Sequence, residues 1–158
     1  MTRRQPDFKR GANMVVTFCG HADFQEKSED KSIVLDILER IIGNANGELL
    51  LGEYGNFDSF AYECCRIYKE RHANVSIIRV TPYLNQKRIS DFEKKFDSVV
   101  YPEIESKPKK FAITYCNRYM VEKSDFVIAY VSHNWGGAYA TYKFAKKHHK
   151  TVFNLATL

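Results

Sequence analysis

A tight turn between a strand and a helix is the part of this sequence best suited to binding an anion. Three consecutive leucines, at 49–51, have the apolar character of a buried strand. Gly52 and Gly55 follow, and Asp58 stands where it can cap the helix that begins next. Because free N–H groups and the helix dipole both attract negative charge, this turn could hold a phosphate. The same residues would also suit an ordinary strand-to-helix connection, with Asp58 as a helix cap alone.

Two ionisable side chains beside the turns could take part in chemistry. Glu53 lies inside the 52–55 turn and is our candidate for a catalytic carboxylate, although a solvated loop glutamate has the same context. His21 follows Gly20 after an apolar segment, where it could transfer a proton, stack on a ring or be a plain loop residue. We expect no metal site and no cofactor; the four cysteines lack the CxxC spacing of zinc ligands.

A second glycine turn follows the most apolar segment of the chain, residues 126–131. Gly136 and Gly137 could bring a second set of backbone N–H groups to a phosphate. Trp135 stands directly before them and could stack on a base, as could Tyr54 in the first turn.

Apolar and amphipathic segments alternate along the chain, and this pattern determines where the turns must lie. It predicts strands over 14–19, 48–51, 75–80, 98–101, 126–131 and 151–155. It predicts helices over 32–42, 56–72, 87–96, 111–123 and 138–149. The alternation indicates a single α/β Rossmann-like domain with a mostly parallel sheet and helices on both faces. In such sheets ligands bind beyond the carboxyl ends of the strands, where the glycine turns should meet.

The charge of the chain is concentrated at its N-terminus. The net charge is +5, and residues 1–13 carry four basic side chains against one acidic one. We expect 1–13 to form a flexible basic arm and 14–158 to form the domain, with either Met1 or Met14 as the native start. Because the rest is nearly neutral and shows no evident stripe of Lys and Arg between aromatic residues, we do not expect nucleic acid as a partner.

The amino-acid composition also indicates where the protein is located in the cell and whether it forms oligomers. No apolar run approaches the roughly 20 residues of a membrane span, and the basic N-terminus lacks the apolar centre of a secretory signal. The cysteine usage favours a reduced, cytoplasmic protein. The tyrosines at 115, 119, 139 and 142 cannot all fit into one small core. We therefore expect a homodimer or a higher homo-oligomer.

The order of the motifs resembles the SLOG superfamily of Rossmann-like nucleotide-binding domains, which is related to the DprA and LOG (lysine decarboxylase-like) proteins. The motifs are Gly-x-x-Gly-x-x-Asp-x-x-Ala from residue 52, Asn-Arg-x-Met from residue 117 and the Gly-Gly of the second turn. The likeness covers most of residues 14–155 and is greatest to small stand-alone bacterial and phage members. It implies that Asn117 and Arg118 lie near the ligand and that the second glycine turn lies beside its phosphate.

Two departures from the family pattern bear on catalysis. Many relatives have a Gly-Gly pair where this chain has Gly52-Glu53, so that a carboxylate enters the loop. The phosphoribohydrolase branch has a catalytic glutamate where this chain has Lys143, and a lysine cannot replace that carboxylate.

Three functions follow from the turns and the resemblance. The first is a module that senses or sequesters a nucleotide-type small molecule, such as an ADP-ribose-like or cyclic nucleotide. The alternative is an enzyme that acts on N-glycosidic bonds, a phosphoribohydrolase or a nucleoside deoxyribosyltransferase, with a carboxylate from Glu53, Asp58 or Glu63. The third is a DprA-like nucleic-acid accessory protein, which the near-neutral charge of residues 14–158 favours least.

Overall fold

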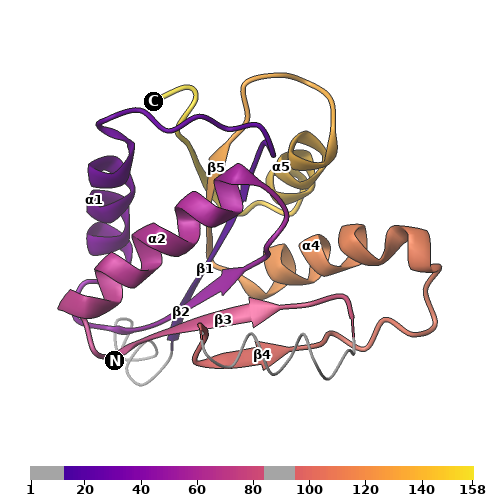
Figure 1. Cartoon of the computed structure of the whole chain (residues 1–158), viewed down its shortest axis with the longest axis horizontal. Helices are drawn as coiled ribbons and strands as arrows, with labels where there is room; N and C mark the ends of the chain where they lie inside the picture. Colours follow the sequence, from indigo (N-terminus) through magenta and orange to yellow (C-terminus); the bar gives the residue numbers. More distant parts are fainter. Residues whose placement is uncertain (1–12, 84–94) are drawn as a thin grey trace, which may run out of the picture.

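Six parallel strands form one sheet in the order β4-β3-β2-β1-β5-β6 (Figure 1). The computed structural model describes residues 13–83 and 95–158. The strands are β1 (Asn13–Gly20), β2 (Asn46–Leu51), β3 (Val75–Val80), β4 (Ser98–Val100), β5 (Phe126–Tyr130) and β6 (Thr151–Asn154). The helices are α1 (Asp30–Ile42), α2 (Asn56–Arg71), α4 (Ala112–Lys123) and α5 (Gly137–Lys147), with a short 3-10 turn η2 (Lys109–Phe111). The predicted Rossmann-like α/β domain is confirmed.

The ends of the observed elements differ from the predicted ones by no more than two residues. The helix predicted over 32–42 begins at Asp30, whose carboxylate accepts a hydrogen bond from the Lys27 N–H at 2.8 Å. The helix predicted over 138–149 ends at Lys147, before His149 with its left-handed φ of 60°. Residues 1–12 of the expected arm and almost all of the expected helix over 87–96 lie outside the described residues.

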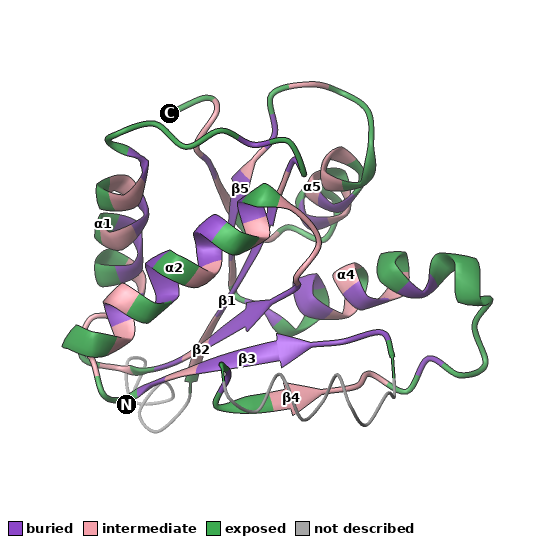
Figure 2. Cartoon of the chain, viewed as in Figure 1, coloured by how far each residue is buried: buried purple, intermediate pink, exposed green. Residues whose placement is uncertain are grey.

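The helices cover opposite faces of the sheet in pairs. Because successive strand residues point to opposite sides, Leu49 and Ile77 pack in one core with α1 and α2, whereas Leu50 and Ile78 pack with α4. Most residues of β1, β2, β3 and β5 and many residues of α2 are buried, while β4 and the start of α4 are largely exposed or intermediate (Figure 2). No helix in the described part of the chain is long and apolar enough to cross a membrane.

The strand order changes direction at β1, and this determines where a ligand can enter. The chain passes from β1 to β2 and β3 on one side, and it returns to β5 and β6 on the other. The ends of β1 and β5 therefore lie side by side, with Gly20 paired to Tyr130. Helices leave these two strands on opposite faces of the sheet, so a crevice opens between them.

Candidate functional site

A cavity of about 380 Å³ opens at the carboxyl edge of the sheet, where β1 and β5 end. Its walls come from the turns after β1 and β2, the loop after β5, and helices α2, α4 and α5. The expected ligand-binding residues that line it are Gly20, His21, Gly52, Tyr54, Asp58, Asn117, Trp135, Gly136 and Gly137. Three others, Glu53, Gly55 and Arg118, do not line it. Ligand binding by all of these residues remains a prediction.

The sequence does not single out several other residues of the cavity wall. Ile113 and Met120 lie on the same side of α4 as Asn117, and the spacing of these three residues, i, i+4 and i+7, could have indicated them. Thr141 lies one turn into α5, and its hydroxyl donates a hydrogen bond to the Gly137 carbonyl at 3.0 Å. Nothing in the sequence marks Thr141 as part of the wall.

Two of the glycines are required by packing rather than by a ligand. A Cβ atom on Gly20 would lie 2.2 Å from Cγ of Phe57, which is fully buried at the start of α2. Gly55 has φ of +143°, and a Cβ atom there would lie 2.7 Å from the Ala22 Cα. These glycines let the turns after β1 and β2 pack directly against each other, and they shape the cavity from behind.

Two backbone N–H groups of the first glycine turn already donate hydrogen bonds within the protein. The Tyr54 N–H donates to Oδ2 of Asp58 at 2.9 Å, and the Asn56 N–H donates to the Ala22 carbonyl at 2.9 Å. Burial raises the pKa of Asp58 above its usual range, against the smaller opposing effects of the Tyr54 N–H and of Arg79. These N–H groups are therefore not available to an anion as the sequence suggested, and the turn presents a buried carboxyl group instead.

The second glycine turn leaves open space beside its glycines and lies at the start of a helix. Gly136 precedes α5 with φ of +91°, a conformation that glycine adopts without strain. Nothing lies within 4 Å of the position that a Cβ atom would occupy at Gly136 or Gly137. The first N–H groups of a helix have no acceptor within the helix, so the start of α5 offers donors to the cavity.

Three stacked rings form the wall of the cavity beside this turn. The His21 and His133 ring centroids are 3.6 Å apart, and those of His133 and Trp135 are 3.7 Å apart. The Ser132 N–H donates to Nε2 of His21 at 2.9 Å, which requires this nitrogen to be unprotonated. Burial, and then the neighbouring His133, lowers the pKa of His21. His21 therefore positions the loop after β5, and the stack ends at Trp135, whose side chain is 65% exposed.

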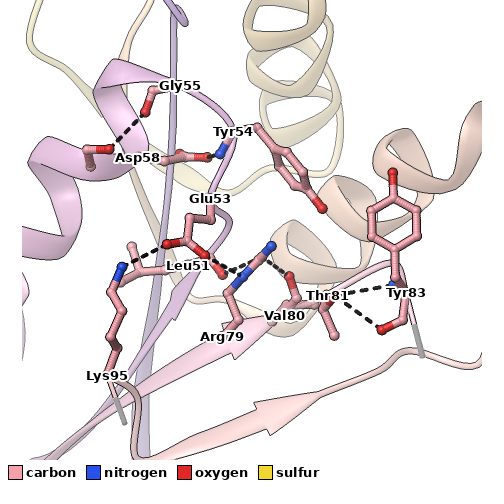
Figure 3. A network of polar contacts seen from close by, with 11 residues as sticks. Leu51, Glu53, Tyr54, Gly55, Asp58, Arg79, Val80, Thr81, Tyr83 and Lys95 are labelled. Atoms are coloured by element: carbon pink, nitrogen blue, oxygen red, sulfur yellow. Dashed lines mark hydrogen bonds and ion pairs between the residues drawn. The ribbon is translucent and has the colours of Figure 1, made fainter. Parts of the chain in front are cut away.

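Glu53 belongs to an ion-pair network outside the cavity (Figure 3). Its carboxylate lies 2.8 Å from Nζ of Lys95 and 3.6 Å from Nε of Arg79. Arg79 is fully buried at the end of β3, donates to the backbone carbonyls of Leu51 and Val80, and lies 5.2 Å from the Tyr54 ring centroid. Glu53 thus serves first to neutralise a buried guanidinium.

The adjacent residues Asn117 and Arg118 point in different directions. Asn117 lines the cavity, whereas Arg118 is exposed on α4. Its guanidinium lies 5.4 Å from the ring centroid of Phe144 on α5 and 5.9 Å from that of Tyr115. The structure therefore gives Arg118 a position on the outer surface where α4 and α5 meet.

Basic side chains pair with aromatic rings along α4, α5 and the turn before α4. Residues 107–158 contain nine Lys and Arg against two acidic residues, an excess that the small net charge of the chain conceals. Further lysines lie over rings: Lys107 over Tyr115, Lys110 over Phe111, Lys123 over Tyr119, Lys143 over Tyr139 and Lys146 over Tyr142. The expectation that no such interleaving exists is wrong.

Comparison with solved structures finds the same fold in DNA processing protein A (DprA). DprA from Helicobacter pylori, described for its single-stranded DNA binding mode, matches with a TM-score of 0.61 and 16% identity over 89% of this chain and 64% of that chain. DprA from Streptococcus pneumoniae matches with a TM-score of 0.63 and 14% identity over 90% of this chain and 50% of that chain. No family model and no curated protein sequence matches this chain.

These matches support the DprA side of the resemblance at the level of fold, and they correct one expectation. The chain spans 64% and 50% of the two DprA chains, at identities that show a shared fold alone. Nucleic acid was not expected as a partner because residues 14–158 are nearly neutral. The similarity to DNA processing proteins, one of them described as binding single-stranded DNA, overturns that exclusion.

Proposed function

We propose that this chain binds single-stranded DNA and holds one nucleotide of the strand in the cavity. The observation that supports this best is the meeting of a free helix N-terminus with the exposed Trp135 at the second glycine turn. Backbone N–H groups recognise a phosphate, and an exposed ring recognises a base, so the pair suits a nucleotide. The fold shared with DprA and the basic excess of residues 107–158 favour a strand over a free nucleotide.

Different walls of the cavity would bind the phosphate, the sugar and the base of the nucleotide. The phosphate lies at Gly136 and Gly137, because the carboxyl group of Asp58 across the cavity would repel it. Asp58 uses one oxygen to hold the Tyr54 N–H. Its other oxygen can accept a hydrogen bond from the free hydroxyl of a terminal nucleotide, or from the ribose of a free nucleotide, because the sugar inside a DNA strand has no hydroxyl. The base stacks on the indole of Trp135, as the last member of the existing ring stack.

A free nucleotide-derived ligand is the second candidate, and the cavity itself favours it. A volume of about 380 Å³ lies within the range of small-molecule sites and can enclose one nucleotide. If the bound nucleotide is also cleaved at its N-glycosidic bond, Asp58 takes the place of Glu53 as the acidic group. Asp58 lines the cavity, and burial raises its pKa in the direction that a general acid requires.

Trp135 provides a direct test, since it is the only tryptophan in the chain. We expect octathymidylate to quench the intrinsic fluorescence of the protein when a thymine stacks on the indole. The same titration with dithymidylate, with thymidine monophosphate and with ADP-ribose compares a strand with free nucleotides. Chromatography of each mixture detects any cleavage of the glycosidic bond.

Two variants make the titration decisive. Gly136→Val should abolish the quenching, because a side chain there blocks the approach to the N–H groups; the strained φ should also cost about 1–3 kcal/mol of stability. Arg40→Gln, on the exposed end of α1, is a control that should bind like the wild type. Absence of quenching, and of any anisotropy change with labelled octathymidylate, would refute DNA binding. Preference for ADP-ribose over octathymidylate would select the second candidate.

A further inference from the structure

A row of cations and rings runs along the outer surface where α4 and α5 meet; we call it the seam cluster. It consists of Lys107, Tyr115, Arg118, Phe144 and His148. Lys107 lies 5.1 Å from the Tyr115 ring centroid, and the Arg118 guanidinium lies over both Tyr115 and Phe144. The Phe144 and His148 ring centroids are 4.0 Å apart. Each member therefore touches the next, and Arg118 joins the two helices.

The seam cluster leads away from the cavity along two helices that both begin at its wall. Asn117, which lines the cavity, is followed directly by Arg118, and Thr141 lines it one turn before Phe144. Figure 1 shows α4 and α5 on the same side of the molecule, where they pack against the strands and against each other. A strand that leaves the cavity between α4 and α5 therefore meets the seam cluster first.

The cations of the seam cluster have few acidic neighbours along α4 and α5. Within the described residues, neither Lys107 nor Arg118 forms a salt bridge. α5 contains no acidic residue, and α4 contains Glu122 alone. Cations held over rings can bind phosphates while bases stack on the rings or on the guanidinium plane, which is how proteins hold single strands without reading their sequence.

We infer that the seam cluster binds the nucleotides of a DNA strand that follow the one in the cavity, with Arg118 and Lys107 contacting phosphates. This inference rests on the proposed function and adds the path of the strand to it. It also assigns Arg118 to a phosphate outside the cavity, where the sequence motif alone placed it beside the bound ligand.

The test compares a short and a long strand on one double variant. Wild-type protein should bind octathymidylate more tightly than dithymidylate, because only the longer strand reaches from the cavity to the seam cluster. Lys107→Gln/Arg118→Gln should weaken octathymidylate binding by about fivefold, as expected for the loss of two exposed ion pairs. Its plot of log affinity against log salt should be shallower by about 1.4, since each phosphate contact on a single strand contributes about 0.7. Dithymidylate binding and its quenching of Trp135 should not change.

Arg40→Gln/Arg71→Gln is the matched control. It removes two exposed cations from α1 and α2, on the other face of the sheet, and should retain wild-type affinity and salt dependence for both strands. Equal losses in the two double variants would show a general effect of net charge and overturn the inference. Loss of dithymidylate binding in the Lys107/Arg118 variant would place Arg118 in the cavity and overturn it too. If the wild type bound neither strand, the proposed function would be refuted, and this inference with it.

Discussion

Replacement of Glu53 by Gln tests whether this residue is structural, as its contacts indicate, or catalytic. The substitution keeps the size of the side chain and removes the carboxylate that pairs with Arg79 and Lys95. Loss of one partner from a fully buried ion pair costs about 3–5 kcal/mol, and loss from an exposed pair costs about 1 kcal/mol or less. Arg79 is fully buried, but the Glu53 side chain is 33% exposed and the pair is long at 3.6 Å. We therefore expect an intermediate loss of about 2 kcal/mol.

Urea denaturation followed by circular dichroism measures this loss directly. For a chain of this length, about 2 kcal/mol should lower the melting temperature by roughly 4–8 °C. Lys95→Gln is the matched control: its side chain is 46% exposed, so it should cost about 0.5 kcal/mol. Glu53→Gln combined with Arg79→Met should recover most of the loss, because an apolar side chain leaves no buried charge to neutralise. Wild-type stability of Glu53→Gln would refute the structural role, and loss of turnover without loss of stability would return Glu53 to catalysis.

Two further predictions concern the cavity walls. Gly20→Ala should lower the free energy of unfolding by about 1–3 kcal/mol, because its Cβ would overlap the buried Phe57 ring. Gly137→Ala places its Cβ in open space, so its free energy of unfolding should stay within about 0.5 kcal/mol of the wild-type value. Equal effects of the two substitutions in thermal melts would contradict the packing argument. The lowered pKa of His21 means that the folded state favours the neutral ring, so its contribution to stability is present above pH 6.5 and is lost on acidification through the folded-state pKa. Urea midpoints measured across pH should show this decline in the wild type and a smaller one in His21→Gln, and identical profiles would exclude His21 as its source.

The architecture of this protein could be predicted from its amino-acid sequence alone. Hydrophobic periodicity is a local property, so each strand and each described helix could be located within two residues of its observed ends. Alternation of strands with helices requires parallel strands, and parallel strands end at the same edge. For that reason the glycine turns after β1, β2 and β5 could be predicted to meet, and they do line one cavity.

Which residues of each turn face that cavity depends on packing between elements that are distant in the sequence. Asn117 and Arg118 are adjacent in sequence, but successive helix residues point about 100° apart, so one lines the cavity and the other lies on the outer surface. Glu53 and Tyr54 separate in the same way, because the buried Arg79 from a different strand attracts the carboxylate. The two glycine turns look alike in sequence, yet the Tyr54 and Asn56 N–H groups of the first donate to Asp58 and Ala22, which only folding brings close. The basic excess of residues 107–158 could be counted from the sequence, but the pairing of Arg118 with Phe144 depends on two helices packing together.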